Sequence, residues 1–104
     1  MRKIVSRMRH HPVQKRVALA VYTGITSGRA IALGVARFAE EVGNWHLICG
    51  DEMRLPGELR RVASVVDGLI VASPDDDGLE VCREVCGRIP VVLVGDEEPG
   101  LISV

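Results

Sequence analysis

The residues best suited to chemistry follow the first apolar run of the chain, in a loop of glycines and hydroxyl side chains. Gly24-Ile25-Thr26-Ser27-Gly28-Arg29 comes directly after the run at 17–22 and Thr23. Its spacing matches neither GxGxxG, which binds a dinucleotide pyrophosphate, nor GxxxxGK[ST], which cradles nucleotide phosphates. We therefore favour a plain turn followed by a helix that Ser27 caps over a loop that binds phosphate. The Thr23, Thr26 and Ser27 hydroxyls leave a polar small-molecule ligand as an open alternative.

Catalytic groups are missing from the places where this layout would need them. A phosphoacceptor domain needs an acidic pair after the first strand and an aspartate ending the third, but these places read Tyr22-Thr23-Gly24 and Ala72-Ser73. A cysteine nucleophile directly after the first strand is also missing. His46 has no serine or cysteine partner suggested by the sequence. We therefore predict a protein that is not an enzyme and uses no cofactor.

Two acidic clusters and one histidine pair are candidate metal ligands. The clusters are Asp75-Asp76-Asp77 and Asp96-Glu97-Glu98, and the histidines are His10-His11. Magnesium is usually bound together with a phosphate group, and the sequence has no phosphate-binding motif. We therefore favour a helix cap and a solvated turn as the roles of the two clusters. Adjacent histidines without further ligands make a poor metal site. We predict that no metal is bound.

Apolar runs of strand length alternate with helical patterns along the chain. Strands are expected at 17–22, 45–49, 69–72 and 91–94, and a fifth strand begins in 101–104. Helices are expected from Ser27 to position 42, from Pro56 in a short segment, and from the aspartates at 75–77 to Gly87. This alternation predicts an α/β fold with a parallel sheet covered by helices on both faces. Any site should then lie at the carboxyl ends of the strands.

Side-chain spacing predicts which faces of these elements are buried. Ile31, Val35, Phe38 and Val42 form one apolar helical stripe, which we expect to be buried, and Gly43 suits a left-handed cap after it. Cys82 and Cys86 fall on an apolar helix stripe and Cys49 ends an apolar strand. We expect all three thiols to pack in the core.

A basic arm precedes an acidic body. Residues 1–16 hold six basic and no acidic residues, and the rest holds seven basic and 14 acidic residues, which gives charges of +6 and −7. We expect residues 1–15 to be a flexible, solubilising arm and residues 16–104 to be the folded lobe. The alternative is non-specific contact with DNA phosphates, although no helix-turn-helix pattern follows the arm.

The cysteine count and the hydropathy pattern bear on location. Three cysteines at these spacings suit neither a disulfide framework nor a zinc ribbon. The apolar run after Arg16 is too short for a signal peptide, and no stretch reaches the roughly 20 apolar residues of a membrane span. We expect a cytoplasmic protein without a membrane partner.

Several motifs together resemble a known family of regulators. They are RVALAVYTGITSGRAIALGVARFAEEVGNWHLICGD, RRVASVVDGLIVAS and IPVVLVGD, all within residues 16–104. These segments resemble the N-terminal part of the effector domain of xylose operon regulatory proteins, which are arabinose-regulator (AraC-type) transcription factors. That domain is similar to the LacI/GalR and periplasmic sugar-binding fold, a three-layer, Rossmann-like or flavodoxin-like lobe of type I.

The resemblance implies a sugar-sensing function. In that family a pentose sits in the cleft between two lobes and shifts a separate C-terminal DNA-binding domain, which we expect to lie outside this chain. Carried over by position, the candidate effector-binding residues are Tyr22, Thr23, Arg29, Ser73, Asp75 and Asp96. Arg29 is the strongest, because a guanidinium can donate paired hydrogen bonds to vicinal sugar oxygens. Its alternative role is an ion pair with Glu or Asp on the surface.

Two other functions stay open at this point. The second reading is the lobe of a transporter sugar-binding protein, which shares this fold, although the missing signal peptide counts against it. The third is a small α/β enzyme with an unrecognised site. Because the sequence stops inside an expected strand, we expect a partial lobe with an uncovered helix face and an unpaired sheet edge. We therefore also expect self-association, in the simplest case as a homodimer.

Overall fold

The computed structural model describes residues 14–24, 26–95 and 102–103 of the chain. Within them five strands form one parallel sheet in the order β2-β1-β3-β4-β5. The strands are β1 (Lys15–Ala20), β2 (Trp45–Gly50), β3 (Gly68–Ala72), β4 (Val91–Val94) and β5 (Ile102–Ser103). The α/β class and the all-parallel sheet expected from the sequence are confirmed.

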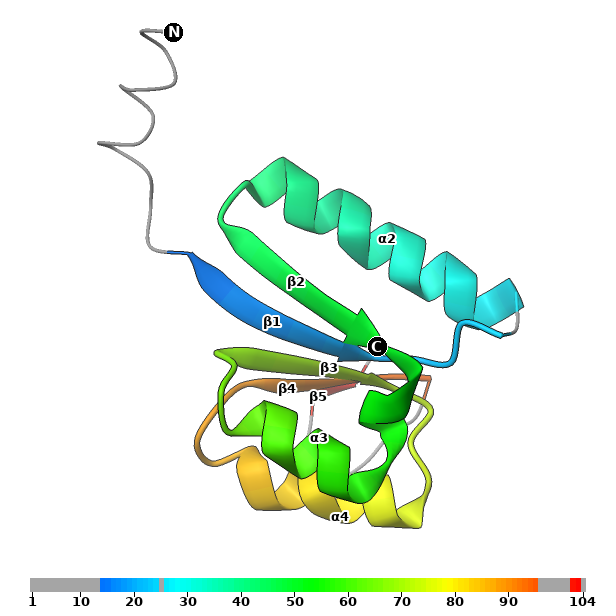
Figure 1. The fold of residues 1–104 in the computed structure, drawn as a ribbon, viewed down its shortest axis with the longest axis vertical. Coiled ribbons are helices and arrows are strands. Elements are labelled where there is room, and N and C mark those ends of the chain that lie inside the picture. The colour runs from blue at the N-terminus through cyan, green and yellow to red at the C-terminus, as the bar shows by residue number, and fades with distance from the viewer. Residues whose placement is uncertain (1–13, 25, 96–101, 104) are drawn as a thin grey trace, which may run out of the picture.

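Helices lie on both faces of this sheet (Figure 1). α2 (Thr26–Val42) covers one face beside β1 and β2, and α3 (Pro56–Ala63) and α4 (Asp76–Val85) cover the other. A short 3-10 helix, η1 (Asp51–Arg54), joins β2 to α3 and was not expected from the sequence. The molecule therefore has the three layers expected of a Rossmann-like or flavodoxin-like sheet.

Local signals position these elements as predicted in most places. Pro56 occupies the first turn of α3, and Asp75 caps α4 by accepting a hydrogen bond from the Gly78 N–H over 2.8 Å. Gly43 has a φ of +78° and ends α2, with its N–H donating to the Ala39 carbonyl over 3.1 Å. α2 already includes Thr26, so Ser27 lies in its first turn instead of capping it.

The first strand begins one residue before the expected folded part. Lys15 pairs with Trp45 in the parallel register of β1 and β2, and its N–H donates to the Asn44 carbonyl over 2.7 Å. The sheet thus starts inside what we expected to be the arm. Residues 1–13, which hold the remainder of that arm, lie outside the described part of the chain.

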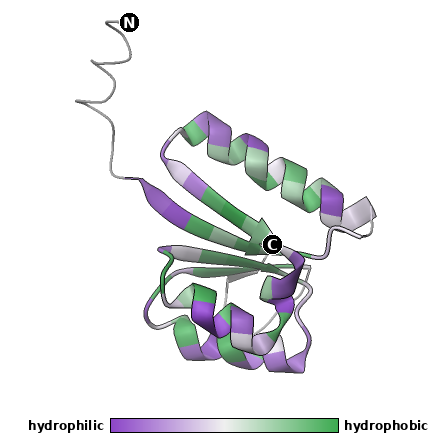
Figure 2. Ribbon diagram, viewed as in Figure 1, coloured by the Kyte–Doolittle hydropathy of each residue, from purple (hydrophilic) through white to green (hydrophobic). Residues whose placement is uncertain are grey.

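The core is unequal on the two faces of the sheet. The larger cluster lies between the sheet and α3 and α4, and it includes Leu59, Leu69, Val81 and Leu93. The cluster under α2 has only Leu19, Val21 and Ala72 fully buried, with partly buried residues around it. Figure 2 shows the hydrophobic residues along the strands and the hydrophilic ones on the outer sides of α3 and α4. In the described part of the chain, one face of the sheet is fully covered and the other is only half covered.

Two expectations about burial are corrected. Phe38 and Val42 were expected in the buried stripe of α2, but Phe38 is 48% exposed to solvent and Val42 is 42% exposed. Cys49 and Cys86 were expected in the core, but both are exposed and only Cys82 is buried. The physical reason is the same in each case: the helix or strand presents these side chains beyond the area that a neighbouring layer covers.

The close approach of α2 to β1 gives a first prediction. A Cβ added at Gly28 would overlap the Tyr22 backbone carbonyl, whereas a Cβ added at Gly34 on the same helix meets nothing within 4 Å. Gly28→Ala should therefore lower the free energy of unfolding by about 1–3 kcal/mol. Gly34→Ala should raise it by about 0.5–1 kcal/mol, because alanine favours a helix interior. Urea denaturation of both variants checks this, and a neutral or stabilising Gly28→Ala would contradict the packing.

Candidate functional site

The candidate site lies at the carboxyl ends of β1 and β3, which are neighbours in the sheet. β1 leads into α2 on one face, and β3 leads into α4 on the other face. Ligands of open parallel sheets bind where two adjacent strands connect to opposite faces in this way. The loops that follow the two strands are therefore the first place to look for a site.

A hollow of about 90 Å³ opens between these loops and the start of α2. Its polar lining comes from Tyr22 after β1, Ser27 in the first turn of α2, Arg54 from η1 and Ser73 after β3. Gly28 allows α2 to begin against the Tyr22 carbonyl, as described above, and so forms one wall of the hollow. The sheet order thus brings together residues from four separate segments of the chain.

Arg54 is the main residue of this hollow that sequence reasoning missed. Its Nη2 donates to the Ser73 backbone carbonyl over 3.0 Å, and its Nε is buried without a hydrogen-bond partner. A buried donor without an acceptor is rare in proteins. The available signal was its place in Gly50–Arg54, a segment that follows β2 at the same edge of the sheet. Nothing in the sequence shows that η1 turns the guanidinium inward.

Ser73 adopts an unusual backbone conformation at the end of β3. Its φ is +45°, the only positive value for a non-glycine residue in the described part of the chain. Its N–H donates to the Val94 carbonyl over 3.0 Å, and Gly95, with a φ of +95°, passes close to its hydroxyl. Left-handed backbone at non-glycine residues is uncommon and clusters at functional sites. The turn after β3 is therefore held by β4 and by Arg54.

Thr23 and Arg29, both predicted site residues, belong to one hydrogen-bonded loop. The Thr23 N–H and hydroxyl donate to Asp51 Oδ1 over 3.2 and 3.1 Å. Arg29 donates to the Thr23 carbonyl over 3.1 Å and to the Thr26 hydroxyl over 3.3 Å. The guanidinium of Arg29 thus binds its own loop, which is neither of the two roles considered from the sequence. Together these contacts fix the rim between β1 and α2.

The other four predicted site residues lie outside the hydrogen-bonded loop of Thr23 and Arg29. Tyr22 lines the hollow and is 46% exposed, with its ring lying against Gly24. Ser73 lines the hollow, and the Asp75 carboxylate serves as the cap of α4. Asp96 lies outside the described residues. In the described ranges no group of three or more His, Cys, Asp or Glu side chains could hold a metal ion.

This arrangement can bind a polar ligand. Serine and tyrosine hydroxyls both donate and accept hydrogen bonds, and a guanidinium donates several in one plane. The ring of Tyr22 adds an apolar surface next to them. A small set of polar groups around a shallow, partly apolar hollow is typical of recognition of a small molecule.

The three cysteines give a second prediction. Burial raises the pKa of the Cys82 thiol to about 11, with Cys86 adding to the shift. Burial and then the charge of Asp51 raise the pKa of the Cys49 thiol. At pH 8 a thiol with a pKa of about 11 is thiolate in about one molecule in a thousand. Cys82 should therefore resist alkylation until the protein unfolds, while Cys49 and Cys86 react.

Asp51→Asn tests the electrostatic part of this prediction. Removing the negative charge lowers the pKa of Cys49, so more thiolate is present at pH 8 and alkylation should be faster. Cys86 in the same sample serves as the control, because its rate should stay unchanged. Mass spectrometry of the digested protein separates the two sites. An unchanged Cys49 rate would show that Asp51 does not act on this thiol.

None of the described helices is long and apolar enough to cross a membrane. Comparison with known proteins assigns no family to the chain. No protein-family model matches it, and neither a curated protein nor a solved structure matches it significantly. The geometry of the edge between β1 and β3 is therefore the basis on which a function can be proposed.

Proposed function

We propose that this chain is a lobe of a ligand-sensing domain that binds a polyhydroxylated small molecule, with a pentose as the first candidate. The observation that carries this proposal is the hollow between the carboxyl ends of β1 and β3, lined by Tyr22, Ser27, Arg54 and Ser73. The lining offers hydroxyls and one guanidinium, which suit neutral hydroxyl groups that both donate and accept hydrogen bonds.

The chemistry of a pentose fits this lining. Vicinal sugar hydroxyls would accept hydrogen bonds from the Arg54 guanidinium. They would both donate hydrogen bonds to and accept them from the Ser27 and Ser73 hydroxyls. The apolar C–H face of a sugar ring packs on an aromatic ring, and Tyr22 is the aromatic residue at this rim. The unpartnered Nε of Arg54 is a donor that a ligand oxygen could satisfy after a small side-chain shift.

The size of the hollow predicts weak binding by this lobe alone. Sites for drug-sized ligands enclose roughly 300–1,000 Å³, whereas this hollow is about 90 Å³ and open to solvent. It can hold only part of a pentose. The rest of the ligand surface would face a second lobe, as in the regulators that the sequence resembles. A dissociation constant on the order of millimolar is expected for the single lobe.

A two-lobed sensor would convert this binding into regulation. A ligand that contacts both lobes stabilises the closed arrangement, and that difference in affinity biases an attached DNA-binding domain. The resemblance of residues 16–104 to the effector domain of xylose operon regulators supports this role. In that role the lobe performs no bond-breaking chemistry.

The first test is an NMR titration of the chain with D-xylose, D-ribose and D-glucose. We expect amide shifts at Tyr22, Ser27, Arg54 and Ser73, with midpoints on the order of millimolar to tens of millimolar. Ser27→Ala should weaken the shifts at least several-fold, because a hydroxyl partner is lost. Ser64→Ala, which removes a hydroxyl bonded to the Arg61 carbonyl at the end of α3, is the matched control. Shifts that are absent for all sugars, or lie elsewhere, would overturn the proposal.

A further inference from the structure

The hollow between the carboxyl ends of β1 and β3 carries a single full charge, and that charge is positive. Of the eight residues that line it, Arg54 is the one that is charged at pH 7, and none is an aspartate or a glutamate. The chain as a whole has 14 acidic and 13 basic residues. The absence of a carboxylate from this lining therefore sets the hollow apart from the acidic body around it.

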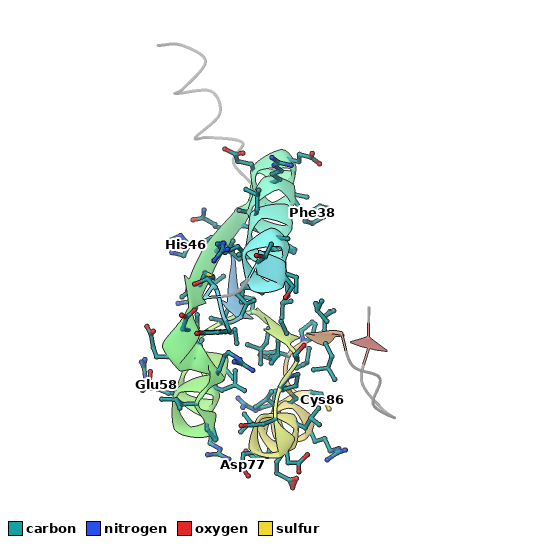
Figure 3. The ribbon with its side chains drawn as sticks, turned by 90° about the vertical axis from the view of Figure 1, so that its right-hand side faces the viewer. Phe38, His46, Glu58, Asp77 and Cys86 are labelled. Atoms are coloured by element: carbon teal, nitrogen blue, oxygen red, sulfur yellow. The ribbon has the colours of Figure 1, made fainter. Side chains whose placement is uncertain are left out.

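The charge of Arg54 is not neutralised by a carboxylate of the described residues. The ion pairs found there lie on α3 and α4. Figure 3 shows Glu58 of α3 and Asp77 of α4 at the outer sides of these two helices. In the loop before Arg54, the Asp51 carboxylate accepts two hydrogen bonds from Thr23. Arg54 therefore lies at the hollow as a cation without a counter-charge.

The guanidinium of Arg54 also has hydrogen-bonding capacity left. A guanidinium has five N–H donors. Within the described residues the hydrogen bond of this one goes to the Ser73 carbonyl over 3.0 Å, and its Nε is buried without a partner. Burying a charged donor without a partner is costly, so such a group calls for an acceptor. An acceptor that is itself negative would supply both the hydrogen bonds and the counter-charge.

The first turn of α2 adds to the positive potential of the hollow. Ser27 and Gly28, the second and third residues of this helix, line the hollow beside Arg54. The first N–H groups of a helix have no partner within it and form the positive end of its dipole. The first turn of α2 has no acidic residue, whereas the first turns of α3 and α4 both have at least one. The positive end of α2 is therefore not offset by a side chain of its own first turn.

We propose that the ligand is an acidic sugar derivative, either a sugar acid or a sugar phosphate, whose anionic group binds between Arg54 and the first turn of α2; this assignment rests on the ligand-sensing function proposed above. Carboxylates and phosphates both accept paired hydrogen bonds from a guanidinium. The Ser27 and Ser73 hydroxyls donate to the same group, and the carbon skeleton packs on Tyr22. The hollow of about 90 Å³ is far below the roughly 300–1,000 Å³ of a site that encloses a whole ligand, as expected where one group of the ligand enters.

Paired NMR titrations of the chain test this charge preference at matched ionic strength. D-xylose is compared with D-xylonate, and D-ribose with D-ribose 5-phosphate, so that the two pairs distinguish a carboxylate from a phosphate. At least one anion should bind with a dissociation constant roughly tenfold or more below that of its neutral parent, with amide shifts at Ser27, Arg54 and Ser73. Between about 0.01 and 0.1 M salt this preference should shrink, because the Debye length falls from about 30 to 10 Å.

Each outcome of these titrations has a distinct meaning. Neutral sugars that bind as tightly as both anions would overturn the charge preference and leave the proposed function standing. Binding of no sugar, neutral or charged, would overturn both. Inorganic phosphate that binds as tightly as D-ribose 5-phosphate would overturn the assignment to an acidic sugar, because the sugar would then add nothing.

Two charge-removing variants separate contact with Arg54 from the effect of net charge. Arg54→Gln should raise the dissociation constant of the preferred anion roughly tenfold and change that of its neutral parent much less. Arg54→Lys keeps the charge and should keep part of the preference. Arg37→Gln removes the same charge from an exposed position of α2 outside the hollow and is the matched control. A preference that survives Arg54→Gln, or that Arg37→Gln reduces equally, would overturn the proposal.

Discussion

A parallel sheet that is apolar on both faces must be covered on both faces, and the rest of this structure depends on how that requirement is met. α3 and α4 meet it on one side, where Leu59, Leu69 and Leu93 are fully buried or nearly so. On the other side α2 lies along β1 and β2, and within the described residues Ile70 of β3 and Val92 of β4 are only partly buried. The start of α2 and the end of β3 meet at the hollow of the carboxyl edge.

The carboxyl edge is built by contacts that serve the fold and the site together. Gly28 lets α2 start against the Tyr22 carbonyl, and Arg29 ties the loop between β1 and α2 together. On the other side of the hollow, Arg54 holds the left-handed turn at Ser73. A rim with so many backbone contacts is fixed before a ligand arrives, so the proposed ligand would bind with little loss of conformational freedom.

Sequence reasoning predicted the features that depend on local chemistry. Gly43 in a left-handed cap, Pro56 in a first turn and Asp75 as a helix cap each follow from one residue type at one backbone position. The features it missed depend on which neighbours lie above a surface. Phe38, Val42 and Cys86 have the spacing of buried residues, but no layer formed by the described residues covers them, and periodicity cannot show where a layer ends. Arg54 was missed because the inward direction of its side chain is set by η1 and by Ser73, which lies 19 positions further along the chain.

α2 connects the hollow to an aromatic contact further along the sheet. Its first turn, with Ser27 and Gly28, is one wall of the hollow, and Phe38 near its other end packs edge-on against Trp45 of β2, with 5.2 Å between ring centroids. A helix is stiff over its length, so a contact that fixes α2 against the sheet at one end also restricts the position of its first turn. Because coupling between two sites is reciprocal, a ligand that orders the first turn would in the same way favour the packing of Phe38 on Trp45.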